Sequence, residues 1–174
     1  MCSCLLIGPT DAGKTLLLKR LKNYNSSNKA DLSQETHATI ATVGVNIVNL
    51  AAGKRQEVVV KELGGCMAPI WHKYYKKATL LVYVVDMSNR FQISSSCIQF
   101  LSLIKSPHLA KSSVLILLNK IDLPATMTRK EVDCLWRLDD ITRHTTQKVE
   151  VLEISAQTGQ GLEDVVKWLH NQAK

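Results

Sequence analysis

Short apolar runs alternate with segments that mix apolar and polar residues along most of the chain; at residues 15–22, for example, leucines are interleaved with basic residues. An apolar run of roughly four to eight residues is typical of a buried strand, and apolar residues at a helical period are typical of a surface helix. The pattern predicts about six strands and about five helices. The strands are expected at residues 2–7, 42–50, 56–61, 78–85, 114–118 and 149–154. The clearest helices are expected at residues 15–22 and 93–104, from Thr128, where Glu131 completes a capping box, and at 162–170.

Strands that alternate with helices are typical of an α/β fold with a mostly parallel sheet. Residues 42–50 and 56–61 are separated only by the turn-like residues 51–55, which indicates a hairpin and therefore one antiparallel edge strand. Residues 23–33 are rich in Asn and Ser and are expected to form a mobile loop. The length of 174 residues predicts a single domain over 1–174.

The formal net charge is +7, and the basic residues are spread along the chain with one mild cluster. A basic cluster at His72, Lys73, Lys76 and Lys77 is interpreted first as a solvated helix face. The alternative is a surface that meets acidic lipid headgroups or an acidic partner. We expect no nucleic-acid partner, because no DNA- or RNA-binding motif accompanies the charge. The longest apolar runs are too short to cross a bilayer.

Five cysteines are present without a CxxC pair, and no signal peptide is evident. We therefore expect free thiols in a reducing compartment, and a cytoplasmic protein. No zinc site can be assembled from their spacing. The cysteines are Cys2, Cys4, Cys66, Cys97 and Cys134.

The segment from Gly8 to Thr15 fits the pattern G-x-x-x-x-G-K-[ST], with a predicted strand before it and a predicted helix after it. Glycines allow backbone N–H groups to approach phosphate oxygens, and the helix N-terminus favours an anion. Lys14 is expected to reach the β- and γ-phosphates, and the Thr15 hydroxyl to ligate Mg²⁺. The predicted phosphate-binding residues are Gly8, Pro9, Thr10, Asp11, Ala12, Gly13, Lys14 and Thr15.

A second polar motif, Asn119-Lys120-Ile121-Asp122, directly follows a buried strand. The Asp122 carboxylate can accept hydrogen bonds from N1–H and the exocyclic amine of guanine, for which adenine has no equivalent donor pair. The Lys120 stem can lie along the base, and Asn119 can tie loops together. At the end of the last strand, Ser155 and Ala156 stand where the Ala156 N–H could donate to guanine O6. These residues predict GTP or GDP as the ligand.

Two further segments can sense a γ-phosphate. Thr42, after the predicted mobile loop, can close onto Mg²⁺. Glu62, after the strand at 56–61, can hold Mg²⁺ through water, and the N–H of Gly65 can meet the γ-phosphate. Together with the phosphate loop they predict a segment that orders with GTP and relaxes with GDP. The predicted Mg²⁺ ligands are Thr15, Thr42 and Glu62.

The order of these motifs resembles that of Ras-superfamily GTPases, and their details resemble the Arf-like branch over essentially the whole chain. Residues 42–46 resemble the first switch of that family, and residues 63–65 with 70–75 resemble the second switch and its helix. Residues 84–90, 119–124 and 155–162 are also similar to the family. The resemblance implies a small GTPase fold and a regulatory switch. It also implies catalytic roles around the γ-phosphate for Lys14, Thr42 and Gly65.

The chain departs from the family at the second switch. Lys61 replaces an exposed aromatic residue that family effectors use, which implies a different choice of effector. Glu62 replaces aspartate, and Cys66 replaces the glutamine that orients the attacking water. A thiol is a weak donor and a weak acceptor, so we expect slow intrinsic GTP hydrolysis. Thr10, Asp11 and Ala41 also depart from the family pattern.

The resemblance implies effectors, exchange factors and GAPs as partners, and a setting in membrane traffic, at the Golgi or at cilia. Cys2 occupies position two, so we expect no N-myristoyl group, and residues 171–174 are not a prenylation motif. Cys2 is interpreted as a small residue of the first strand; palmitoylation of its thiol is the less favoured alternative. Membrane contact is expected to be indirect or electrostatic, and the protein to be a monomer.

Two other functions remain open at this point. The chain could hold GTP and barely hydrolyse it, with Cys66 as the reason. It could also be a small-molecule P-loop kinase that uses ATP, although residues 119–122 and 155–156 favour guanine and no Arg-rich lid segment follows the core. Nucleotide competition and hydrolysis distinguish the three.

Overall fold

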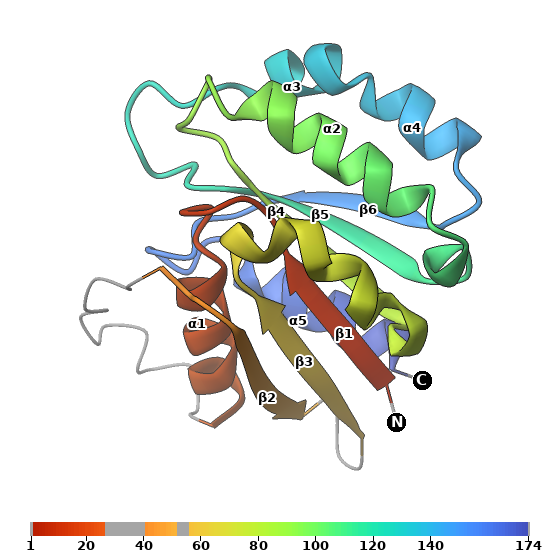
Figure 1. The fold of residues 1–174 in the computed structure, drawn as a ribbon. Helices are drawn as coiled ribbons and strands as arrows, with labels where there is room; N and C mark the ends of the chain where they lie inside the picture. The colour runs from red at the N-terminus through yellow and green to blue at the C-terminus, as the bar shows by residue number, and fades with distance from the viewer. Residues whose placement is uncertain (1, 27–40, 52–55, 174) are drawn as a thin grey trace.

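The computed structural model describes residues 2–26, 41–51 and 56–173, which form one six-stranded sheet flanked by helices (Figure 1). The strand order is β2-β3-β1-β4-β5-β6. Strand β2 runs antiparallel to β3 at one edge, and the other neighbouring pairs are parallel. The mostly parallel sheet with one antiparallel edge strand is therefore confirmed. The strands are β1 (Cys2–Ile7), β2 (Val45–Ala51), β3 (Glu57–Leu63), β4 (Leu80–Asp86), β5 (Ser113–Asn119) and β6 (Val149–Glu153).

Helices cover both faces of the sheet, as an α/β core requires. On one face, α1 (Lys14–Ser26) and α5 (Leu162–Gln172) pack in one apolar cluster. On the other face, the 3₁₀ segment η1 (Gly65–Lys77) and helix α2 (Ile93–Ile104) pack in a second cluster. This face is completed by η2 (Pro107–Leu109), α3 (Arg129–Trp136) and α4 (Leu138–His144). No helix in the described ranges is both long and apolar enough to cross a membrane.

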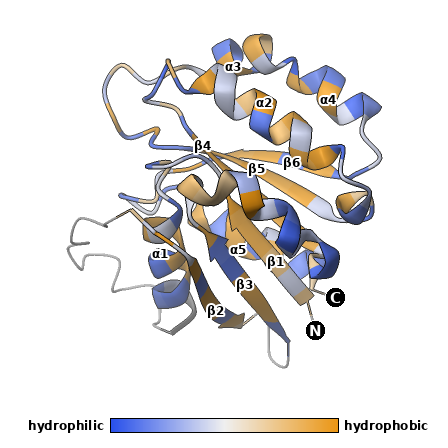
Figure 2. Ribbon diagram, in the orientation of Figure 1, coloured by the Kyte–Doolittle hydropathy of each residue, from blue (hydrophilic) through white to orange (hydrophobic). Residues whose placement is uncertain are grey.

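The central strands are buried on both sides, which explains why they read as continuous apolar runs. All seven residues of β4 are buried, and Figure 2 shows the middle of the sheet as mostly hydrophobic. The ring of Tyr83 lies 5.3 Å from Phe100 and 6.3 Å from Trp136, centroid to centroid. Trp136, Trp71 and Trp168 are all buried in the two apolar clusters. All five cysteines, which fall within the described ranges, are free thiols.

Three elements differ from the sequence prediction. Helix α1 continues to Ser26, so the start of the predicted loop at 23–33 is helical, and residues 27–33 lie outside the described residues. The first hairpin strand begins at Val45 and not at residue 42, and most of its turn, at 52–55, also lies outside them. Helix α4 was not predicted. It begins after Arg137, whose left-handed φ of 51° ends α3 and turns the chain.

The parallel register brings five strand ends to one edge of the sheet. Strands β1, β3, β4, β5 and β6 all point their carboxyl ends there, with Asp86 of β4 directly beside Asn119 of β5. In open α/β sheets, ligands bind outside the carboxyl ends of the strands. The polar motifs predicted from the sequence therefore meet at this edge.

Candidate nucleotide-binding site

Two glycines fix the course of the loop between β1 and α1. Gly8 has a φ of +152°, and a Cβ added there would lie 2.3 Å from the carbonyl oxygen of Val84. Gly13 has a φ of +91°, and its Cβ would lie 2.4 Å from Nδ2 of Asn119. No side chain fits at either position. The loop therefore curls over the end of β4 and enters α1 in the form that a phosphate-binding loop at a helix N-terminus needs.

The side chain of Lys14 folds back over this loop and is buried. Its Nζ donates hydrogen bonds to the carbonyl oxygens of Gly8, at 2.9 Å, and Pro9, at 2.5 Å. Burial lowers the pKa of Lys14 to about 8, although the charges of Glu62 and Asp11 act in the opposite direction. A phosphate next to this ammonium would favour its protonated form and raise the pKa again. Lys14 thus offers a cation that a phosphate would complement.

Three oxygen-bearing side chains meet beside Lys14. The Thr15 hydroxyl donates a hydrogen bond to Oε1 of Glu62 and lies 2.8 Å from Oγ1 of Thr42. The Thr42 hydroxyl lies 3.4 Å from the same Oε1, and Nδ2 of Asn46 lies 3.3 Å from the other carboxylate oxygen. Glu62 is fully buried, and these donors together with the nearby charge of Lys14 compensate its carboxylate.

This cluster fits the chemistry of Mg²⁺, which prefers oxygen ligands and uses one or two carboxylates together with phosphate oxygens. Two hydroxyls and one carboxylate already converge there. Within the described ranges, no group of three or more His, Cys, Asp or Glu side chains could hold a metal by itself. The residues present therefore suit a metal that is shared with a phosphate ligand.

The two expected switch segments pack against each other and against the phosphate loop. The N–H of Gly64 donates to the carbonyl of Gly44 at 3.1 Å. A Cβ on Gly65 would lie 2.2 Å from the backbone nitrogen of Thr10, so the backbone of Gly65 lies directly on the phosphate loop. The buried indole of Trp71 donates to the carbonyl of Gly64 at 3.1 Å, which holds this turn in place.

Cys66 follows at the mouth of the site and is exposed. Its Sγ lies 3.7 Å from the carbonyl oxygen of Thr42, a weak contact that joins the two segments. A pocket of about 370 Å³ lies between them and the phosphate loop. It is lined by Thr10, Asp11, Gly13, Lys14, Thr15, Leu16, Ala41, Thr42, Val43, Glu62, Gly65, Cys66 and Lys120.

Asn119 holds the other end of the site together. Its side chain is buried, its Nδ2 donates to the carbonyl of Ala12 at 2.8 Å, and its Oδ1 accepts from the N–H of Ala156 at 3.0 Å. The expected tie between loops is present. The Ala156 N–H, which we expected to meet guanine O6, is engaged by Asn119, so a bond to the base would have to share or replace this contact.

The carboxylate of Asp122 lies at the surface of this end. Its Oδ1 accepts a hydrogen bond of 2.5 Å from the hydroxyl of Ser155, which also accepts from the N–H of Thr158. Ser155 therefore acts on Asp122 and fixes its direction, a role that the sequence alone did not indicate. The remaining carboxylate oxygen can accept from a base.

Asp86 is a residue of this site that the sequence analysis did not single out. Its buried carboxylate forms an ion pair with Lys120, with 2.7 Å between Nζ and Oδ2. The other oxygen, Oδ1, accepts from the backbone N–H and the hydroxyl of Ser88, at 2.8 Å and 2.6 Å. Lys120 itself has a left-handed φ of 71°. An acidic residue at the end of a buried strand, beside the strand that ends in Asn119, was the signal that could have identified it.

Comparisons with known proteins agree with this geometry. The sequence pattern of the ADP-ribosylation factor family matches residues 1–173. The chain is 46% identical over 167 residues to ADP-ribosylation factor-like protein 16 of Homo sapiens, which covers 95% of this chain and 83% of that protein. It is 31% identical over 169 residues to ADP-ribosylation factor-like protein 1 of Drosophila melanogaster, covering 96% and 86%.

A solved structure shares the fold. The Arl6 (BBS3) small GTPase from Trypanosoma brucei, determined with the bound nucleotide analogue GppNp, matches with a TM-score of 0.81 and 19% sequence identity. The match covers 99% of this chain and 96% of that one. The small GTPase fold predicted from the sequence is confirmed, and this chain belongs to the ADP-ribosylation factor family, whose members are small GTPases that bind GTP and GDP.

Proposed function

We propose that this protein is a GTP/GDP switch that signals to effector proteins through residues 42–51, 57–63 and 64–77. One observation carries the proposal: the phosphate loop, the segment at Thr42–Gly44 and the turn at Gly64–Gly65 are in mutual contact beside Lys14. Such an arrangement can respond to a single phosphate group, because both segments lie where the terminal phosphate of a nucleotide on this loop would be.

In this proposal each residue has a defined task. Lys14 and the backbone of residues 8–13 bind the phosphates, and the N–H of Gly65 donates to the terminal one. Thr15, Thr42 and Glu62 would hold Mg²⁺, which neutralises phosphate charge. At the base end, Asp122 accepts from the N1–H and amine of guanine, Lys120 lies along the ring, and Asn119 with Ser155 and Ala156 keeps the two loops together.

Loss of the terminal phosphate removes the bonds that favour the packed switch segments, so effectors can distinguish the two nucleotide states. Exchange factors and GAPs would set the balance between those states. By similarity to its family, we propose a cytoplasmic protein that acts in intracellular or ciliary membrane traffic, with recruitment to Golgi or ciliary membranes through partners.

Nucleotide competition tests the guanine site. A fluorescent GDP analogue bound to the protein should be displaced by GTP or GDP and not by ATP. Asp122→Asn should weaken GDP binding by roughly tenfold or more, because hydrogen bonds to a charged group are lost. The same variant should gain affinity for xanthosine diphosphate, since the new amide can donate to the second carbonyl of xanthine. Displacement by ATP would favour a P-loop kinase instead.

A second function rests on Cys66, which stands where its family has the water-orienting glutamine. In this alternative the protein binds GTP and hydrolyses it very slowly, so that a partner must supply the off-switch. The exposed thiol contacts only the Thr42 carbonyl among the polar groups of the described residues. A thiol cannot donate to and accept from water as a carboxamide does.

Single-turnover hydrolysis of preloaded GTP measures this directly. We expect Cys66→Gln to raise the rate by roughly tenfold or more, because a positioned polar group near the reacting water is worth at least that much. Cys66→Ser, which changes the thiol to a hydroxyl of similar size, should remain slow and serves as the control. Wild-type hydrolysis as fast as that of ordinary Arf-like proteins would contradict the alternative.

A further inference from the structure

Three large aliphatic side chains are exposed on β2, just before β2 and on η1. Val43 is 88% exposed, Ile47 on β2 is 59% exposed and Ile70 on η1 is 37% exposed. Large aliphatic side chains at this exposure are individually common, but three of them on the two predicted switch segments and the strand between mark a contact surface. Of the three, Val43 also lines the pocket beside Lys14.

Lys61 lies on this same face. It is the antiparallel partner of Ile47 on the neighbouring strand, and directly opposed residues project from the same side of a sheet. On its other side Lys61 is paired with Leu5 of β1, which packs in the cluster that η1 covers. The lysine is half-buried. Its stem therefore lies along apolar neighbours while its ammonium reaches the surface.

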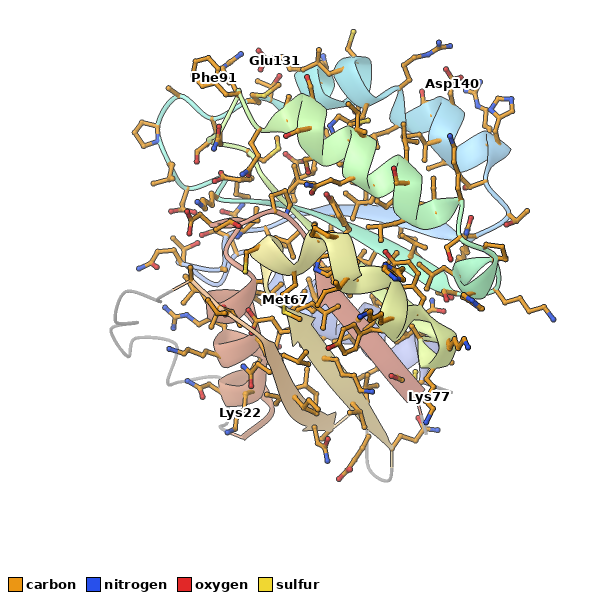
Figure 3. The ribbon with its side chains drawn as sticks, in the orientation of Figure 1. Lys22, Met67, Lys77, Phe91, Glu131 and Asp140 are labelled. Atoms are coloured by element: carbon orange, nitrogen blue, oxygen red, sulfur yellow. The ribbon has the colours of Figure 1, made fainter. Side chains whose placement is uncertain are left out.

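On β2 and η1, the exposed charged side chains that the structure describes are all basic. Segment η1 adds exposed His72, Lys73, Lys76 and Lys77 and contains no acidic residue. Figure 2 shows the C-terminal end of η1 as strongly hydrophilic, and Figure 3 labels Lys77 at this end. Strand β2 has no charged residue, and on β3 Glu62 is buried towards Thr15 while Glu57 is at the opposite end.

No acidic side chain of the described ranges pairs with these cations. Across the described residues, neither Lys61 nor any of the three lysines of η1 forms an ion pair. A cation that rests among apolar groups without an internal partner gains most from a carboxylate that approaches it while water is excluded. In the part of the chain that the structure describes, β2 and η1 therefore offer cations and exposed aliphatic side chains and no acidic group.

We infer that this surface, the basic switch face formed by Val43, Ile47, Lys61, Ile70 and Lys73, binds an acidic segment of a partner protein. The segment inserts aliphatic or aromatic side chains beside Ile47 and Ile70, and sets a carboxylate on Lys61. This inference rests on the proposed switch function and names the chemistry of its effector. It also gives Lys61 a selective role: partners that present a neutral or basic side chain there are rejected.

A protein segment fits this surface better than an anionic membrane. Lys61 is recessed between two strands and flanked by apolar side chains at fixed positions, which is a local shape that a matching side chain recognises. A bilayer responds to the number of charges near its surface and not to one half-buried lysine. The lysines of η1 would then accelerate encounter with the acidic segment, as complementary charges do.

The test is selection, from a phage-displayed library of random peptides, of those that bind the full chain loaded with GppNp. Selected peptides should be enriched in Asp and Glu next to Leu, Ile or Phe. Fluorescence anisotropy of one such peptide should show a Kd that rises roughly tenfold or more with Lys61→Glu, because a desolvated charge pair is replaced by repulsion. Lys61→Arg should retain binding. Lys130→Glu, which makes the same charge change on exposed α3, should alter the Kd less than about twofold, as distant surface charges are screened.

The charge-reversed peptide, with its Glu residues changed to Lys, should bind Lys61→Glu better than wild type. Selection of neutral peptides, or of none, would overturn the inference, as would cosedimentation with phosphatidylserine vesicles that Lys61→Glu abolishes. Wild type and variant are first compared for GppNp binding. If both bind the nucleotide and no acidic preference is found, only this inference fails. If wild type binds no guanine nucleotide, the proposed function fails with it.

Discussion

At the scale of single residues, the buried carboxylate of Asp86 holds Lys120 in place at the end where we propose that the guanine base binds. Asp86 joins Lys120, through the 2.7 Å ion pair, to the end of β4. Ser88 satisfies the second carboxylate oxygen. A lysine on a flexible stem would otherwise sample many positions above the base, at a cost in side-chain entropy on binding. In the proposed site we therefore expect Asp86 to position Lys120 for the guanine base.

Removing this ion pair gives a clear prediction. Asp86→Asn should raise the Kd for GDP by roughly tenfold, because breaking one side of a buried pair costs more than about a kcal/mol. The loss should appear mainly as faster GDP release in stopped-flow fluorescence. The control is Asp133→Asn, which breaks the partly exposed pair of Asp133 with Arg129 on α3. Unchanged GDP release in Asp86→Asn would show that Lys120 is positioned without Asp86.

The sequence motifs predicted which residues would meet at this site. They did not predict which side chains would form hydrogen bonds or ion pairs with one another. Lys14, Thr15, Thr42 and Glu62 come together as their motifs predict. The engagement of Ala156 by Asn119 could not be read from the sequence, because it depends on the separation of two loops that are joined only by the sheet register. The pairing of Asp86 with Lys120 has the same origin.

At the scale of elements, helix α3 shows a local signal that needs no tertiary context. Thr128 is its N-cap: its hydroxyl accepts from the N–H of Glu131 at 3.3 Å, and its own N–H donates to the Glu131 carboxylate at 2.7 Å. This reciprocal pair satisfies two donors that a helix start leaves free. The capping box predicted from the sequence is confirmed.

Thr128→Ala should lower the free energy of unfolding by about 1 kcal/mol, the usual cost of losing an N-cap side chain. Urea denaturation followed by circular dichroism measures this change. Thr142→Ala serves as the matched control, because exposed Thr142 lies within α4 and its hydroxyl bonds only to a carbonyl of its own helix. Equal losses in the two variants would argue against a specific role for the cap.

Other elements depended on contacts that no local pattern reports. The segment 65–77 forms a 3₁₀ helix with Pro69 inside it. Its buried Trp71 and Tyr75 pack it into the same apolar cluster as residues of β1. Helix α4 is short and is separated from α3 only by the left-handed Arg137. The pattern of apolar residues therefore did not distinguish α4 from α3. Strands β1, β4 and β5 were predicted within about two residues, since buried strands are continuous apolar runs with distinct ends.

At the scale of the whole molecule, the sheet turns scattered motifs into one site. The carboxyl ends of β1, β3, β4, β5 and β6 lie at one edge of the sheet. The phosphate loop, the turn at Gly64–Gly65 and the loops at Asn119 and Ser155 follow these ends, and the segment at Thr42–Gly44 enters antiparallel β2 at the same edge. The two segments that contact the phosphate loop also carry Val43 and Ile70, which are exposed. Loss or gain of a terminal phosphate at this loop can therefore alter the exposed surface directly, without a structural change through the core.

Hydrogen exchange of the full chain, loaded first with GDP and then with GppNp, tests the switch most directly. We predict slower exchange with GppNp at the backbone amides of residues 42–45 and 64–67, because a terminal phosphate would stabilise their mutual packing. Buried β4 and β5 should exchange equally in both states. Identical exchange of residues 42–45 and 64–67 with the two nucleotides, both shown to be bound, would contradict the central claim that this protein is a nucleotide-dependent switch.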